Sequence, residues 1–307
     1  MDQEHFALLF ERAGYRVIRS PSSYWIDGGD RVFLSIPPDR SFDLPEEEAR
    51  ETFRAHLALG LKFCTLTQAG SPGALYIVED KDYGLQNLHA RHRWYVRRGL
   101  ERCEVREIDL DFLARHGMPC NLDTLRRQGR RHAFQNSAKW ERFCAAARST
   151  PGAGAWGAFV QGTLAAYMMY FVCESTCHLL HEMSRSDLLK PWYPNHVLQY
   201  VTIHEMIRRD GICRISGGFE SLVPLPGLDR YKRYGGYKKM PLTIRVLLRP
   251  LVKPFLLHPG TRVLLGAASR VFWLRNTALK ARAVLDIASR SAGPGDPFPA
   301  EQQEKSK

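Results

Sequence analysis

Short runs that alternate apolar and polar residues recur through the first half of the chain, and this spacing predicts β-strands. The segment YWIDGGDRVFLSIP, residues 24–37, predicts a hairpin because Asp27-Gly28-Gly29-Asp30 is a tight-turn sequence between two such runs. Further strands are predicted at GYRVIRS, LKFCTLT, ALYIVED and CEVREI. Helices are predicted at residues 3–13, 44–57, 87–102 and 124–149. The first half is therefore predicted to be a mixed α/β unit that ends near residue 150.

The apolar pattern restarts after Pro151-Gly152 with three strand-like segments, AWGAFV, TLAAYMMYFV and CHLLHEMS. Turn sequences at Gln161-Gly162 and Glu174-Ser175-Thr176 join them into hairpins. A helix is predicted at residues 194–209, then the strand CRIS, a second helix after Gly227 and the strand YKKMPLTIRV. This order predicts a small sheet in which the two helices come only after the third strand.

The segment of residues 245–290 mixes aliphatic and aromatic residues with evenly spaced arginines and lysines, and it predicts one helix over residues 261–289. Packing on the sheet, contact with an anionic membrane surface and a dimer contact all remain open for it. The following sequence, GPGDPFPAEQQEKSK, has the composition of a disordered terminus.

Composition indicates a globular, intracellular protein. Hydrophobic residues make up 44% of the 307 residues, which is enough for a sizeable core. Seven scattered cysteines without a CxxC motif favour a reducing compartment. The N-terminal sequence is too polar for a signal peptide, and the weakly polar run of residues 158–173 is too short to span a bilayer. We expect a cytoplasmic protein, with contact at the inner membrane face left open.

The formal net charge of +12 is concentrated in two blocks, residues 89–148 with a net charge of +7 and residues 245–290 with +8. Such blocks suit a polyanion, an anionic membrane or a phosphate-bearing ligand, although a solvated basic surface explains either block alone. For the first block we predict a surface for a polyanion, tRNA first. Its residues are Arg93, Arg97, Arg98, Arg126, Arg127, Arg130 and Arg131.

The stretch ISGGFESLVPLPGLDRYKRYGGYKK, residues 215–239, has a glycine pair near each end and a short polar helix between them. That helix carries Tyr231 and Lys232. Glycine lets the backbone approach a ligand closely, so the stretch favours a binding site. The alternative is that the tyrosines close the core and the lysine is solvated.

Four stretches resemble the Fem-type, FemAB-like group of GNAT-superfamily acyltransferases, a group that includes peptidoglycan interpeptide-bridge transferases. They are GTLAAYMMYFV, YPNHVLQYVTIHEMIRRDGI, YKRYGGY and, in the first half, RHRWYVRRGLERCEV. The resemblance implies an α+β fold with two GNAT-like mixed-sheet domains in tandem and a C-terminal helical tail. The predicted segments are an N-terminal domain of residues 1–150, a catalytic-type domain of residues 151–244, the tail of residues 245–290 and a disordered terminus of residues 291–307.

The resemblance also implies a gap between two parallel strands that end near Ser184 and Ser216. The acyl donor is expected to lie in this gap, under the helix that starts at Pro194. A helix N-terminus suits phosphate groups. The donor-binding residues implied are Ser184, Arg185, Lys190, Pro194, Asn195, Ser216, Gly217 and Gly218. The segment MSRSDLLKPW lacks the glycine-rich phosphate loop of the superfamily, so acyl-CoA and aminoacyl-tRNA both remain open as donors.

Tyr231 and Lys232 match the Tyr-Lys pair of the group and are the predicted catalytic residues. The phenol could protonate a leaving thiolate or ribose hydroxyl, and the lysine could hold a substrate anion or offset charge on the acyl oxygen. Ser216 stands where the group often has an acidic residue, so no carboxylate base is carried over.

No metal site is predicted, because the candidate ligands Cys173, Cys177, His178 and His181 straddle a hairpin and 178 and 181 fall on opposite faces of a strand. We expect an N-acyltransferase that moves an acyl or aminoacyl group to an amine on a small molecule, a peptide or a peptidoglycan precursor. The alternative is a non-catalytic, degenerate GNAT module that binds RNA or an anionic membrane through its basic blocks.

Overall fold

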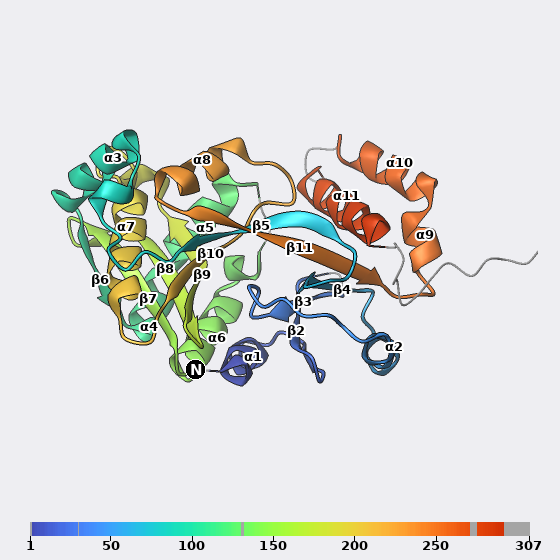
Figure 1. Ribbon diagram of the computed structural model, residues 1–307. Helices are drawn as coiled ribbons and strands as arrows, with labels where there is room; N and C mark the ends of the chain where they lie inside the picture. Colours follow the sequence, from blue (N-terminus) through green and yellow to red (C-terminus); the bar gives the residue numbers. More distant parts are fainter. Residues whose placement is uncertain (1, 30, 130–131, 271–274, 292–307) are drawn as a thin grey trace, which may run out of the picture. The chain divides into compact units, whose positions relative to one another are not determined.

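Helices and strands follow one another along nearly the whole chain in the computed structural model (Figure 1). The structure describes residues 2–29, 31–129, 132–270 and 275–291. Close contacts group them into two units. The first comprises the described residues of 1–17, 74–220 and 224–240, and the second those of 18–73, 221–223 and 241–307. The predicted domain boundaries near residues 150 and 244 are a different division and stay a prediction.

The first unit is built on a mixed sheet with the strand order β5-β10-β9-β8-β7-β6. Its strands are β5 (Ser71–Val78), β6 (Glu104–Ile108), β7 (Ala153–Val160), β8 (Thr163–Cys173), β9 (Thr176–Ser184) and β10 (Arg214–Phe219). β10 runs parallel to β9 and antiparallel to β5, and the pairs from β9 to β6 are antiparallel. Residues of β5 belong to both units, as do those of β11 (Lys238–Leu248).

Helices cover both faces of this sheet. Those of the first unit are α1 (Gln3–Arg12), α3 (Ala90–Leu100), α4 (Leu110–His116), α5 (Met118–Arg127), α6 (Ser137–Arg148), α7 (Pro194–Arg208) and α8 (Pro226–Tyr234). Met168 of β8 packs in a core with the apolar residues of α7, and α3 lies against α7. Tyr167, next to Met168 in β8, contacts Trp140 of α6. Phe171 of the same strand stacks on Phe6 of α1. Because side chains alternate along a strand, α7 and α3 cover one face and α1, α5 and α6 the other.

The strands of the second unit follow in the order β1-β2-β3-β4-β11, with both parallel and antiparallel pairs. Its elements are β1 (Val17–Arg19), β2 (Tyr24–Asp27), β3 (Val32–Ile36), β4 (Gly60–Thr65), α2 (Glu46–Ala55), α9 (Lys253–Leu257), α10 (Pro259–Ala268) and α11 (Arg275–Arg290). Trp25, Phe42 and Phe63 form the aromatic centre of its core. Within the described ranges, no helix is long and apolar enough to cross a membrane.

Most predicted elements are confirmed, including the hairpin of β2 and β3 and the helix from Pro194. The single helix predicted over residues 124–149 is wrong. α5 ends at Arg127 and Gly129 follows with a φ of +57°, a left-handed conformation that ends helices and suits glycine. A new helix, α6, starts after Asn136, whose side chain caps it.

The single helix predicted over residues 261–289 is also wrong, because α10 ends at Ala268 and a turn follows at Ser269-Arg270. The disordered terminus predicted for residues 291–307 lies outside the described residues from 292 onward.

Candidate functional site

The two parallel strands of the first unit separate after a short paired stretch. Pairing joins Arg214–Ser216 of β10 to Thr176–His178 of β9. β9 continues to Ser184 and β10 to Phe219 without further pairing to each other. β10 bulges against β5 in this region, and Gly218 adopts a φ of +83° there, which suits glycine. The structure therefore contains the gap predicted between these strands.

A cavity of about 430 Å³ lies where the strands separate, within the size range of small-molecule sites. Its walls belong to the first unit. The lining residues are Thr124, Arg127, Gln128, Met168, Leu179, Leu180, His181, Glu182, Ser184, Asn195, Gln199, Gly217, Leu228, Tyr231, Lys232 and Tyr237.

A β-bulge in β9 turns Glu182 toward this cavity. The register against β8 shifts between Met169 and Tyr170, and the shift leaves Leu180 as an extra residue. An extra residue reverses the face of every side chain that follows it. Glu182 therefore shares a face with Leu179, which packs on the core beside α7. Strict alternation along the strand would have placed Glu182 on the opposite face. The prediction that His178 and His181 fall on opposite faces is wrong for the same reason, because the extra residue puts both on one face.

Glu182 is partly buried, and its carboxylate has one phenolic partner, since Tyr231 Oη donates to Oε1 over 3.4 Å. Burial raises the pKa of Glu182 from 4.5 to about 7, although the hydrogen bond from Tyr231 and the charge of Lys232 both act to lower it. A carboxylate with a pKa near neutrality can take up and release a proton at physiological pH, as a general base must. The sequence analysis missed this residue.

Tyr231 lies between Glu182 and the start of α7, because its hydroxyl is also 3.2 Å from the main-chain oxygen of Asn195. Burial, followed by the nearby Glu182 carboxylate, raises the pKa of Tyr231 well above 10. The phenol therefore keeps its proton at neutral pH and can donate a hydrogen bond or a proton inside the cavity.

Lys232 reaches the cavity from the same helix, α8. Its Nζ donates to the main-chain oxygen of Gly217 over 2.7 Å and lies 4.3 Å from the centre of the Tyr76 ring. Burial lowers the pKa of Lys232 from 10.5 to about 8, while the Glu182 carboxylate acts in the opposite direction. Lys232 is therefore a cation at neutral pH, held by the ring face and one carbonyl.

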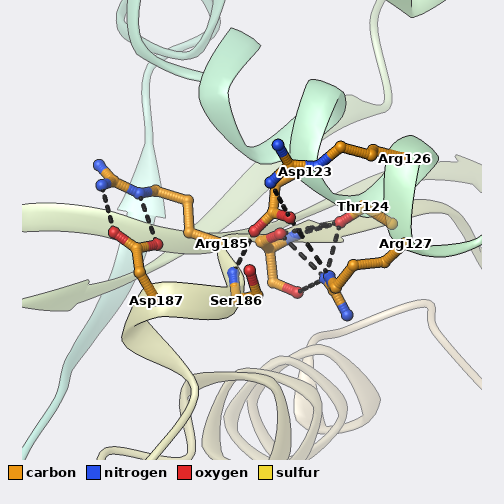
Figure 2. A network of polar contacts seen from close by, with 8 residues as sticks. Asp123, Thr124, Arg126, Arg127, Arg185, Ser186 and Asp187 are labelled. Atoms are coloured by element: carbon orange, nitrogen blue, oxygen red, sulfur yellow. Dashed lines mark hydrogen bonds and ion pairs between the residues drawn. The ribbon is translucent and has the colours of Figure 1, made fainter.

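Polar contacts fix the end of β9 against α5, as Figure 2 shows. Thr124 Oγ1 accepts a hydrogen bond from the Ser184 N–H over 2.8 Å, and Arg127 Nη2 donates to Ser184 Oγ over 2.9 Å. Asp123 accepts a hydrogen bond from the N–H of Ser186, which follows the end of β9 by two residues. Arg127, which the sequence assigned to a polyanion surface, thus holds a wall of the cavity.

The first two turns of α7 bring unpaired acceptors to the cavity. Pro194 starts the helix, and Asn195 Nδ2 donates to Ser184 Oγ over 3.1 Å. The side-chain oxygens of Asn195 and Gln199 are buried and have no hydrogen-bond partner among the described residues. Buried polar atoms are normally paired, so these two oxygens are available to N–H or O–H groups of a ligand.

The structure brings Ser184, Asn195 and Gly217 of the predicted donor residues to the cavity, together with both predicted catalytic residues. The other predicted donor residues are not among its lining residues. They are Arg185, Lys190, Pro194, Ser216 and Gly218. Arg185 instead pairs with Asp187 over 2.6 Å (Figure 2), and Lys190 is exposed.

Five of the seven residues predicted to bind a polyanion lie on α3 and α5. Arg93 donates to main-chain oxygens, Arg98 pairs with Glu101 over 3.1 Å, and Arg97 is exposed. Arg126 pairs with an aspartate of its own helix. Arg130 and Arg131 lie outside the described residues. Use of this set for a polyanion stays a prediction. Among the residues that the structure describes, no group of His, Cys, Asp and Glu side chains is arranged to hold a metal ion.

Replacing Gly217 with alanine is expected to lower the free energy of unfolding by about 1–3 kcal/mol, because an added Cβ overfills a packed site. That Cβ would lie 2.5 Å from Cε1 of Tyr237, a buried ring of the cavity wall. Gly227→Ala is the control, since its Cβ meets nothing within 4 Å. Denaturant unfolding measures both variants, and equal stability of the two would contradict this packing.

No family model matches this sequence, and no curated protein matches it. Among solved structures, FemX superposes with a TM-score of 0.56 at 13% identity, over 81% of this chain and 92% of that one. The C-terminal domain of a protein described as a lysylphosphatidylglycerol synthetase from Agrobacterium fabrum has a TM-score of 0.55 at 14% identity, over 80% and 87%. L-PGS from Bacillus licheniformis has a TM-score of 0.52 at 11% identity, over 80% and 86%.

At these identities the likeness concerns the fold, and the fold is the one that the sequence predicted. Both units contain parallel and antiparallel strand pairs, and the helices α9, α10 and α11 follow the last strand. The chain therefore has an α+β fold like those of FemX and the lysylphosphatidylglycerol synthetase domain.

Proposed function

We propose that this protein is an N-acyltransferase that moves an acyl or aminoacyl group from a thioester or an aminoacyl-tRNA to an amine. The observation that carries this proposal is the group formed by Glu182, Tyr231 and Lys232 at one cavity, where two strands separate. Cavities with perturbed carboxylate and lysine pKa values are typical of catalytic sites. A module that only binds RNA or lipid has no need for a buried carboxylate of this kind.

The three side chains have separate roles in the proposed reaction. The acceptor binds as an ammonium ion and first releases one proton to solvent. As the nitrogen of the resulting neutral amine forms a bond to the acyl carbon, Glu182 takes a proton from that nitrogen. Lys232 offsets the negative charge that develops on the acyl oxygen. As the bond from the acyl carbon to sulfur or to the ribose oxygen breaks, Tyr231 donates its proton to the leaving atom. Glu182 can return the proton to Tyr231 because the two groups are in contact.

The acceptor is proposed to be an amine because the cavity offers hydrogen-bond acceptors at one place. The Glu182 carboxylate and the unpaired oxygens of Asn195 and Gln199 all belong to lining residues. A primary amine in its protonated form has three N–H donors and suits such a set. The likeness in fold to FemX and to the lysylphosphatidylglycerol synthetase domain supports acceptors of the peptidoglycan-precursor or lipid kind, with amine-bearing small molecules and peptides as further candidates.

The donor is tested by ligand-induced stabilisation. Acetyl-CoA, longer acyl-CoAs and aminoacyl-tRNA are each added to the protein, and the true donor raises the melting temperature by mass action. A tRNA donor is also expected to shift the protein in electrophoresis, with an affinity that falls as salt rises. Failure of every donor to stabilise the protein or to support acyl transfer would contradict the proposal.

We propose a cytoplasmic location, since these donors are cytoplasmic metabolites.

The pH profile of acyl transfer is expected to be a narrow bell. The rate rises as Glu182 loses its proton around pH 7, since the base must be ionised, and falls as Lys232 loses its proton around pH 8. Measurement of kcat/KM from pH 5 to pH 10 tests this. A rate that still rises steadily above pH 9 would contradict a role for the Lys232 cation.

A further inference from the structure

The four most exposed large apolar side chains among the described residues lie within residues 251–264, in the turn before α9, on α9 and on α10. Leu251, Phe255, Val263 and Leu264 are 77%, 75%, 71% and 71% exposed. Within the described ranges, the next most exposed large apolar side chain is Leu66, at 68%. Single exposed apolar residues are common on soluble proteins, whereas a group of the most exposed ones marks an interaction surface. We name these four residues the outer face.

The other side of the two helices is already occupied. Leu256, Leu257 and Leu265 pack against β11 and α11 in a small core. α9, α10 and α11 contact one another, as the right-hand part of Figure 1 shows. The inner leucines fix the rotation of each helix, so Phe255 and Leu264, their neighbours in sequence, point away from that core. The outer face is therefore not a part of the core left open by loose packing.

The segment of the chain that carries the outer face is rich in basic residues. Residues 245–290 contain nine Lys and Arg and a single acidic residue, Asp286. Asp286 pairs with Arg262 over 3.4 Å. Arg249 and Arg270 stand before α9 and after α10, and neither has a carboxylate partner among the described residues.

We propose that the outer face binds the surface of an anionic lipid bilayer. Its apolar side chains enter the headgroup region while the arginines at its ends meet lipid phosphates. Symmetric pairing of two copies through this face would set like charges against each other. α10 has 10 residues, which is too short to span a bilayer, so the contact is peripheral. This binding does not depend on the acyl transfer proposed above.

Vesicle sedimentation with the full chain tests the proposal. Vesicles of phosphatidylglycerol and phosphatidylcholine are expected to retain the protein, and pure phosphatidylcholine vesicles to retain about tenfold less. The double variant Phe255→Glu/Leu264→Glu is expected to lower the partition coefficient by about tenfold or more, because it removes apolar surface that enters the bilayer and adds carboxylates that the anionic lipids repel. Arg249→Gln/Arg270→Gln is expected to lower binding to the anionic vesicles alone and to weaken its salt dependence.

Leu66→Glu is the matched control, because Leu66 is almost as exposed and lies outside the outer face. Circular dichroism shows whether each variant is folded. If the glutamate variant is unfolded, the arginine variant supplies the test. The proposal is overturned if wild-type protein ignores anionic vesicles or if Leu66→Glu weakens binding equally. It is also overturned if the wild type is a dimer that Phe255→Glu/Leu264→Glu converts to a monomer, since the occupant would then be a second copy.

Discussion

Glu182→Gln is expected to lower kcat/KM for acyl transfer by roughly 10²- to 10⁴-fold, the usual contribution of a positioned general base. The substitution keeps the shape of the side chain and its hydrogen bond with Tyr231, which is 3.4 Å away. It removes the carboxylate whose pKa burial raises to about 7. Donor affinity, measured by thermal shift, is expected to stay within a few-fold, because the proposed role of Glu182 concerns the acceptor proton.

Glu205→Gln is the matched control, since Glu205 is an exposed glutamate of α7 and does not line the cavity. Both variants are assayed at saturating donor from pH 5 to pH 10. The Glu182 variant should lose the rise in rate around pH 7, which a structural role would leave in place. Full turnover with an unchanged pH profile would show that another group removes the proton.

The order of helices and strands could be predicted from the sequence because the strands are short, alternate apolar and polar residues, and are bounded by turn residues. The hairpin of β2 and β3 follows from Asp27-Gly28-Gly29-Asp30, and the helix at Pro194 follows from a proline in its first turn. The break at Gly129 was missed because isolated glycines also occur inside helices. Its left-handed φ depends on the local path of the chain, which composition does not specify.

Glu182 was missed for a different reason. It lies in CHLLHEMS, a largely apolar strand, and a carboxylate in such a strand was the one signal available in the sequence. Its orientation depends on the bulge at Leu180, which reverses the faces of the residues that follow. The register shift arises from the pairing of β9 with β8, a separate strand, and no local sequence pattern indicates it.

The predicted donor residues divide according to how each is held. Ser184 and Asn195 reach the cavity because α5 and the start of α7 bind each other through Ser184. Arg185 is drawn aside by Asp187, two residues away, an ion pair that the sequence itself shows. Tyr231 and Lys232 line the cavity with Glu182, and their catalytic roles remain predictions that substitution must test.

Lys232→Met is expected to lower kcat by about 10²- to 10³-fold, the usual effect of removing one charged or polar group that stabilises an oxyanion. Methionine keeps most of the length of the side chain and its contact with the Tyr76 ring, which lies 4.3 Å from Nζ. What it loses is the cation, whose pKa burial lowers to about 8. An interaction made chiefly in the transition state affects kcat and kcat/KM alike and leaves KM nearly unchanged.

Lys238→Met is the matched control, because Lys238 is exposed at the start of β11 and does not line the cavity. Tyr231→Phe tests the neighbouring phenol in the same assay and is expected to slow transfer most with donors whose leaving group is the poorest, since these depend most on protonation. The Lys232 variant should also lose the fall in rate around pH 8. A rise in KM at constant kcat would instead assign Lys232 to substrate binding, and full activity of both the Lys232 and Tyr231 variants would make the pair structural.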